Sequence, residues 1–143
     1  MKPGSIMLYA GLILAALNTN AYSATYPGQG CVGRYGASLY YSTTGAQNTG
    51  SSTISISCPV ARLKDGGTAG VTPVIYFIND GKTKSCYFDN YNIDTGGLWS
   101  WTSASGVRRL ALPTLSPTHS WYPLAFNCSL PSQSKVTGYY FSE

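Results

Sequence analysis

Two stretches of the chain alternate between apolar and polar residues, and each carries a cysteine in its apolar set. In residues 54–60 (ISISCPV) and again in residues 124–130 (LAFNCSL), every second position is apolar or cysteine. Successive side chains of a β-strand point to opposite faces, so this period of two predicts strands with one buried and one exposed face. The cysteines fall on the side that is expected to be buried.

Six further short runs have the composition of strands, and segments rich in Gly, Asn, Asp, Ser and Thr separate them. These runs are residues 37–43, 72–80, 84–91, 98–103, 108–115 and 135–142. No segment keeps a helical period of 3.6 residues, so we expect an all-β chain of about eight strands. The spacing favours a single antiparallel β-sandwich, with a small β-barrel as the alternative. Within it, Asp80-Gly81 predicts a two-residue hairpin turn of type I′.

The first residues have the pattern of a signal peptide. Lys2 precedes the uncharged run IMLYAGLILAAL at 6–17, which is too short to span a bilayer. Small residues at Ala21 and Ser23 favour cleavage after Ser23. We therefore predict a signal peptide at 1–23 and one sandwich domain at 24–143, secreted or periplasmic, with no membrane span after cleavage. The net charge of +4 is scattered along the chain, which argues against a nucleic-acid partner.

The four cysteines are Cys31, Cys58, Cys86 and Cys128. An even number in a small exported domain predicts two disulfides, and sequence alone allows three pairings. Consecutive strands are often neighbours, which favours Cys31–Cys58 and Cys86–Cys128. We expect these bonds to clamp the two layers of the sandwich together. The cysteines are too widely spaced for a zinc site, so neither a metal nor another cofactor is predicted.

Catalytic chemistry has little support in this sequence. His119 is the only histidine, and no serine lies in the setting of an activated nucleophile. Asp89 and Asp94 are the best carboxylate pair for a glycosidase, but both are predicted at a hairpin tip. With Asn90 and Asn92 they offer oxygen ligands suited to calcium, although their spacing departs from that of an EF-hand. We predict no catalytic residues and no metal, and a small secreted hydrolase is the least supported alternative.

Trp99 and Trp101 raise the main functional question. In an extended chain the two indoles point to the same side. With Tyr91 they would form an aromatic platform for a sugar, whereas buried in the core they would only stabilise the fold. Two functions remain open: an exported non-enzymatic protein that acts by surface contact, and a carbohydrate-binding module. The expected partner is a carbohydrate or another extracellular protein.

Several motifs together are similar to a loose class of small exported bacterial proteins with two disulfides. The motifs are GQGC at 28–31, ISCPV at 56–60, CYFDNYNIDTGG at 86–97, WYPLAFNCSLP at 121–131 and KVTGYYFSE at 135–143. Because they consist of cysteines and strand ends, this resemblance implies the sandwich and the disulfides. It implies no activity.

Overall fold

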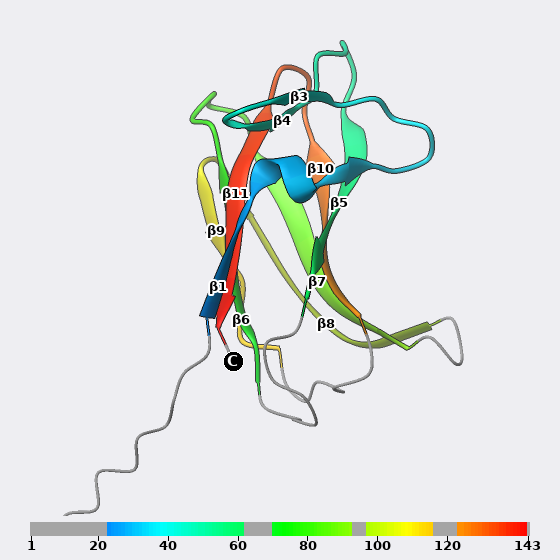
Figure 1. Ribbon diagram of the computed structural model, residues 1–143, viewed down its shortest axis with the longest axis vertical. Helices are drawn as coiled ribbons and strands as arrows, with labels where there is room; N and C mark the ends of the chain where they lie inside the picture. Colours follow the sequence, from blue (N-terminus) through cyan, green and yellow to red (C-terminus); the bar gives the residue numbers. More distant parts are fainter. Residues whose placement is uncertain (1–22, 62–69, 93–96, 116–122, 143) are drawn as a thin grey trace, which may run out of the picture.

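The computed structural model describes residues 23–61, 70–92, 97–115 and 123–142, and these form short and medium strands with one 3₁₀ turn, η1 (Gly28–Gly30) (Figure 1). The strands are β1 (Ser23–Pro27), β2 (Val32–Gly33), β3 (Tyr40–Ser42), β4 (Gly45–Gln47), β5 (Ile54–Val60), β6 (Thr72–Phe77), β7 (Lys84–Asn92), β8 (Gly97–Gly106), β9 (Arg109–Ala111), β10 (Leu124–Leu130) and β11 (Lys135–Ser142). Each of the eight predicted runs overlaps one of these strands.

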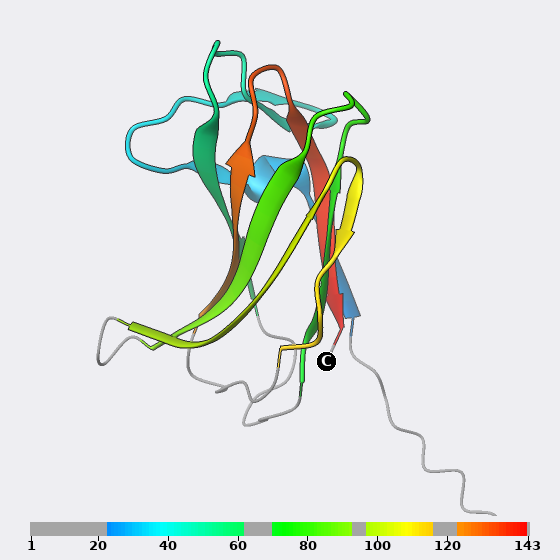
Figure 2. The same cartoon turned by 180° about the vertical axis from the view of Figure 1, so that it is seen from behind.

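Two antiparallel sheets make up the described fold. One has the order β3-β4-β11-β6-β9, with β1 also paired to β11, and the other has the order β2-β5-β10-β7-β8. Figures 1 and 2 show the two sheets as layers facing each other. The predicted β-sandwich is therefore confirmed. The closed barrel is wrong, because each sheet ends in strands that pair on one side only.

The space between the sheets is filled by the apolar sets of the alternating strands, and aromatic rings join the two layers. Phe126 of β10 packs against Phe88 of β7, with ring centroids 4.6 Å apart, and meets the ring of Tyr139 from β11 at 5.7 Å. The Tyr139 hydroxyl then crosses to the other sheet and donates to the carbonyl of Pro59 at 2.9 Å. Tyr26 of β1 stacks on Tyr139 at 5.1 Å. Contact between the layers thus combines apolar burial with tyrosine hydrogen bonds.

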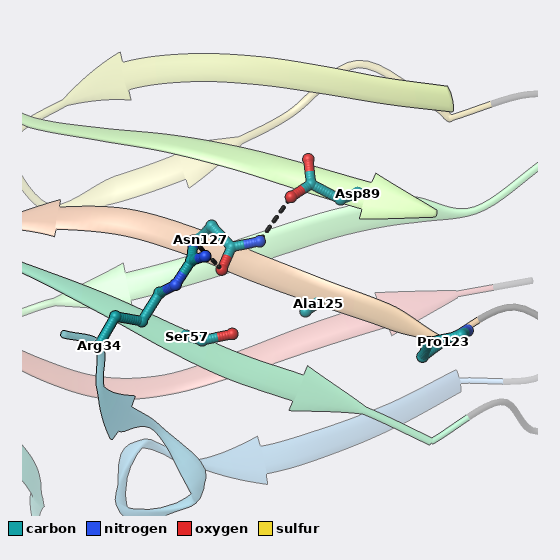
Figure 3. Close-up of a pocket in the computed structure, with 6 residues that line it drawn as sticks. All are labelled: Arg34, Ser57, Asp89, Pro123, Ala125 and Asn127. Atoms are coloured by element: carbon teal, nitrogen blue, oxygen red, sulfur yellow. Dashed lines mark hydrogen bonds between the residues drawn. The ribbon is translucent and has the colours of Figure 1, made fainter. Parts of the chain in front are cut away.

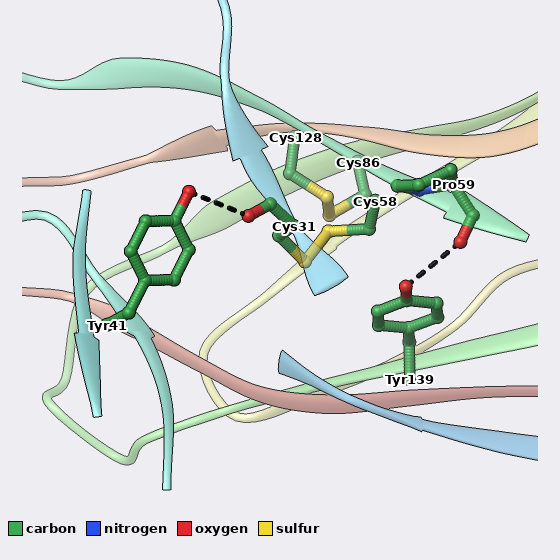
Figure 4. Close-up of a disulfide and its surroundings, with 7 residues drawn as sticks. All are labelled: Cys31, Tyr41, Cys58, Pro59, Cys86, Cys128 and Tyr139. Carbon is green, nitrogen blue, oxygen red and sulfur yellow. Dashed lines mark hydrogen bonds between the residues drawn. A yellow bond between two sulfur atoms is a disulfide. The ribbon is translucent and has the colours of Figure 1, made fainter. Parts of the chain in front are cut away.

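The disulfides join Cys31 to Cys58 and Cys86 to Cys128 (Figure 4). Cys86 and Cys128 are directly opposite each other in the β7–β10 ladder. Cys31 immediately precedes β2 and bonds to β5, the strand that β2 pairs with. Both bonds therefore connect neighbouring segments of the five-stranded sheet. The expectation that the disulfides clamp the two layers together is wrong, because both bonds lie within one sheet. Neighbouring strands of that sheet bring the cysteine Cα atoms to 4.0 and 4.1 Å, which is close enough for each bond to form.

The segment between β6 and β7 also differs from its prediction. These strands belong to different sheets, so residues 78–83 form a crossover between layers and not a hairpin. Gly81 has a left-handed φ of 72°, whereas Asp80 does not have the positive φ that a type I′ turn requires. The Asp-Gly pair marks the change of chain direction correctly, but local sequence does not specify which strand the chain pairs with next.

Asp80 instead organises a closed polar cluster at this crossover. Its carboxylate accepts hydrogen bonds from the side chains of Lys84 and Ser134 and from the backbone N–H of Lys82. The Lys84 side chain is fully buried, and its ammonium also donates to the carbonyl of Val107 at 3.0 Å. These contacts tie together three connections at one end of the sandwich. They hold the pKa of Asp80 at about 2, although burial alone would raise it.

Candidate functional site

The outer face of the five-stranded sheet is polar, because the residues that alternate with its core positions carry hydroxyl, amide, carboxyl and aromatic groups. The ladder places these outward residues side by side across four strands. One row, running from β5 to β8, is Ser57, Asn127, Tyr87 and Ser103, and the next row is Pro59, Ala125, Asp89 and Trp101. The segment that follows β2 adds Arg34, whose backbone N–H donates to the carbonyl of Ser55 at 2.9 Å.

A chain of hydrogen bonds links three of these polar side chains. The guanidinium Nη1 of Arg34 donates to Asn127 Oδ1 at 3.2 Å, and Asn127 Nδ2 donates to a carboxylate oxygen of Asp89 (Figure 3). The two contacts fix which way the Asn127 amide is turned, because its oxygen faces a cation and its nitrogen faces an anion. Asn127 thereby separates the two charges and orients both of them.

Asp89 is almost completely removed from solvent, with 9% of the residue exposed. Burial raises the pKa of its carboxyl, and this effect outweighs the hydrogen bond from Asn127 and the attraction of Arg34, which both lower it. Perturbed carboxyl groups in hollows are common at functional sites. The geometry gives Asp89 the role of a positioned acceptor of hydrogen bonds.

An exposed aromatic pair lies beside Asp89. Trp101 is directly across the ladder from Asp89, and its ring meets that of Tyr87 edge-on with centroids 5.7 Å apart. Trp101 is 56% exposed and Tyr87 is 52% exposed. Large aromatic side chains are costly to leave in water, and a T-shaped contact limits their freedom to turn. The pair therefore offers an apolar surface of fixed orientation next to polar groups.

Described residues line two hollows on this face, and the two hollows share Arg34 and Asn127. The larger, about 240 Å³, is lined by Arg34 and Asp89 among others, and Figure 3 shows the short side chains of Ser57 and Ala125 that also line it. Its lining residues are Arg34, Ser57, Asp89, Pro123, Ala125 and Asn127. The smaller, about 150 Å³, is lined by Arg34, Ser55, Ile56, Tyr87, Asn127, Cys128 and Ser129.

Of the three predicted aromatic residues, the structure describes the side chain of Trp101 but not those of Trp99 and Tyr91. Trp101 is exposed, as a binding platform requires. Trp99 and Tyr91 lie in β8 and β7, but their side chains are outside the described part of the structure. The β7–β8 register shifts here, since Asn90 pairs with Ser100 and Tyr91 with Leu98, so Trp99 has no partner in the ladder. Because the ladder shifts at this bulge, alternation alone does not assign a face to Trp99, and the shared face of Trp99 and Trp101 stays a prediction.

The predicted acidic loop is also displaced. Asp89 and Asn90 lie within strand β7, which continues to Asn92, so the prediction of a hairpin tip at Asp89 is wrong. Asp94 and His119 lie outside the described residues. Across residues 23–61, 70–92, 97–115 and 123–142, no three His, Cys, Asp or Glu side chains gather as metal ligands do.

Sequence reasoning missed Arg34, Asn127 and Tyr87 as site residues. Two signals were present: Asn127 belongs to the polar set of an alternating strand, and Tyr87 is two residues from Asp89 on the same face. Nothing local connects Arg34 to them, because it is 93 residues from Asn127 along the chain.

The chain matches no family model, no curated protein and no solved structure. Within the described residues, no helix is long and apolar enough to cross a membrane.

Proposed function

We propose that this protein is an exported, non-enzymatic binding domain and that the outer face of its five-stranded sheet binds carbohydrate. The observation that carries the proposal is the exposed ring of Trp101 beside the hydrogen-bonded chain of Asp89, Asn127 and Arg34. Sugars present apolar C–H faces and rings of hydroxyl groups. A surface that recognises them needs a flat aromatic ring next to oriented donors and acceptors, and this face has both.

Export is supported by the disulfides. The two bonds join all four cysteines of the chain, and structural disulfides persist in oxidising compartments. Together with the apolar run near the first residue, they favour secretion or delivery to the periplasm. Soluble polysaccharides and cell-surface glycans are accessible partners in either location.

A binding role fits the site better than hydrolysis does. A glycosidase of the common kind flanks the scissile bond with two carboxyl groups about 5 to 9.5 Å apart. Asp89 is the only acidic residue that lines either of the two described hollows. Its carboxyl is paired to a neutral amide, which suits an acceptor of hydroxyl hydrogen bonds.

Replacement of Trp101 by alanine tests the proposal. Truncating a central aromatic contact costs about 2 kcal/mol or more, so Trp101→Ala should weaken binding to a glycan array more than tenfold. Trp101 is exposed, so thermal unfolding should change little. The matched control is Tyr40→Ala, which removes a 59% exposed ring from the other sheet and should leave binding intact.

Two results on the glycan array would contradict the proposal. If the purified wild-type protein binds no glycan, or if Trp101→Ala binds as tightly as the wild type, the outer face is not a carbohydrate site.

A further inference from the structure

The two hollows on the outer face differ in charge although they share Arg34 and Asn127. The larger contains Asp89, so it accepts hydrogen bonds from a ligand. The smaller has no acidic residue in its lining, and it combines the Arg34 guanidinium with the hydroxyl-bearing residues Ser55, Ser129 and Tyr87. One hollow thus suits the hydroxyl groups of a sugar, whereas the other suits an anion.

Arg34 is available to an anionic ligand. Among the described residues no carboxylate lies within ion-pair distance of it. Its guanidinium donates to the Asn127 amide oxygen and lies against the ring of Tyr35. The guanidinium carbon lies 5.0 Å from the Tyr35 ring centroid. A guanidinium has five N–H donors in a planar fork that matches a carboxylate, and the hydrogen bond given for Arg34 among the described residues uses Nη1 alone.

Tyr35 contacts the Arg34 guanidinium, and the backbone of Tyr35 has an unusual conformation. Its φ is 54°, in the left-handed region that non-glycine residues rarely occupy, and its ring is 86% exposed. Such backbone strain is found most often at binding sites. The cation–π contact limits the positions open to Arg34 and keeps the guanidinium over the hollows.

We infer that the ligand is an acidic polysaccharide whose sugar units carry carboxylates, such as uronic acids. This inference rests on the proposed function and specifies its ligand class. A sugar carboxylate enters the smaller hollow and pairs with Arg34, while hydroxyl groups of the same chain donate to Asp89 in the larger hollow. Asn127 stands between the two and keeps the ligand anion apart from the Asp89 carboxylate. The excess of basic over acidic residues adds a general attraction to a polyanion.

The test compares each acidic polymer with its own neutral form. Polygalacturonate, alginate and hyaluronan are each used intact and after reduction of the carboxylates to primary alcohols, and binding is measured by calorimetry. The wild type should bind at least one intact polymer about tenfold or more tightly than its reduced form, because a charge-assisted hydrogen bond contributes that much. Added salt should weaken binding of the intact polymers and leave binding of their reduced forms unchanged.

Two arginine substitutions test whether the preference for the intact polymer depends on Arg34. Arg34→Gln should bring the ratio of the two affinities close to one while the reduced polymer binds as before. Arg109→Gln, at an exposed position of strand β9 in the other sheet, removes the same charge and should preserve the ratio. Poly-glutamate provides an acidic peptide arm, and it should bind weakly and without dependence on Trp101.

Each contrary result has its own meaning. Equal affinity for intact and reduced polymers overturns the acidic ligand but leaves carbohydrate binding in place, as does binding of neutral glycans alone. Poly-glutamate binding as tight as that of the best polyuronate, and unaffected by Trp101→Ala, also overturns it. Binding to none of the polymers and to no glycan on an array overturns the proposed function itself.

Discussion

The carboxylates of Asp80 and Asp89 are both largely withdrawn from water, yet their surroundings differ. Asp80 is held by a fully buried lysine, a serine hydroxyl and a backbone N–H, and its pKa falls to about 2. Among the described residues Asp89 accepts a hydrogen bond from one neutral amide, a cation lies farther away, and burial raises its pKa. The first cluster completes its own hydrogen bonds, whereas the second borders a hollow. A carboxylate whose hydrogen bonds are all made within the fold stabilises that fold. A carboxylate that can still accept hydrogen bonds is available to a ligand.

The largest effect is expected at the closed cluster. Lys84→Met removes the cation from Asp80 and a donor from the Val107 carbonyl, and it leaves a carboxylate with only 16% of its side chain exposed. Removing one partner of a buried ion pair costs about 3 kcal/mol or more. Urea unfolding should show a loss of that size.

Lys82→Met is the matched control, because Lys82 is an exposed lysine of the same crossover. It should change the free energy of unfolding by about 0.5 kcal/mol at most. Equal effects of the two substitutions would mean that the closed cluster does not hold the crossover.

Isosteric replacement of each aspartate sharpens the contrast. Asp80→Asn leaves the buried Lys84 charge without its counter-ion, and we expect a loss of about 2 kcal/mol or more. Asp89→Asn removes a carboxylate that burial penalises and keeps an oxygen that can accept from Asn127. Its free energy of unfolding at neutral pH should therefore stay within about 1 kcal/mol of the wild type. A larger loss at Asp89 than at Asp80 would reverse the assignment of the two sites.

Lowering the pH should change the contributions of Asp80 and Asp89 to the free energy of unfolding in opposite directions. Because the pKa of Asp80 is about 2 in the folded state against 3.8 as its ordinary value, its contribution is complete above pH 3.8 and is lost as the pH falls towards 2. The loss amounts to about 2 kcal/mol. The raised pKa of Asp89 works the other way, since its ionisation costs stability as the pH rises above 3.8.

Unfolding curves between pH 2 and pH 5 measure this difference. The acid-induced loss should be smaller in Asp80→Asn and should persist in Asp89→Asn. A loss of the same size in Asp80→Asn and the wild type would assign the acid sensitivity to other groups.

Much of the fold could be predicted from local pattern, and most of the site could not. Alternation and turn residues are properties of short segments, so they locate strands such as β5 and β10 without knowledge of the partner strands. The turn at Asp80-Gly81 was also visible, but its crossover between sheets depends on the packing of the whole chain. Asp89 was misplaced because Asn, Asp and Gly nearby indicate a turn, while pairing with β10 extends the strand.

The site depends on contacts between distant segments. Arg34 and Asn127 meet only when β2 joins β5 and β5 joins β10, and no periodicity in the sequence specifies that order. The register shift between β7 and β8 leaves Trp99 without a ladder partner, so the period of two alone does not decide which face its side chain takes. Trp101 could be identified from its sequence, and its exposure required the structure.

The most direct measurement is titration of the two side-chain carboxyl carbons by NMR, with Asp80→Asn and Asp89→Asn used to assign the signals. We expect Asp80 to titrate at about pH 2 and Asp89 to titrate above its ordinary value of 3.8. Addition of the best polyuronate should then shift the Asp89 signal and leave the Asp80 signal in place. Titration of both carboxyls near 3.8, or a ligand-induced shift at Asp80 alone, would contradict the division between a structural and a binding carboxylate.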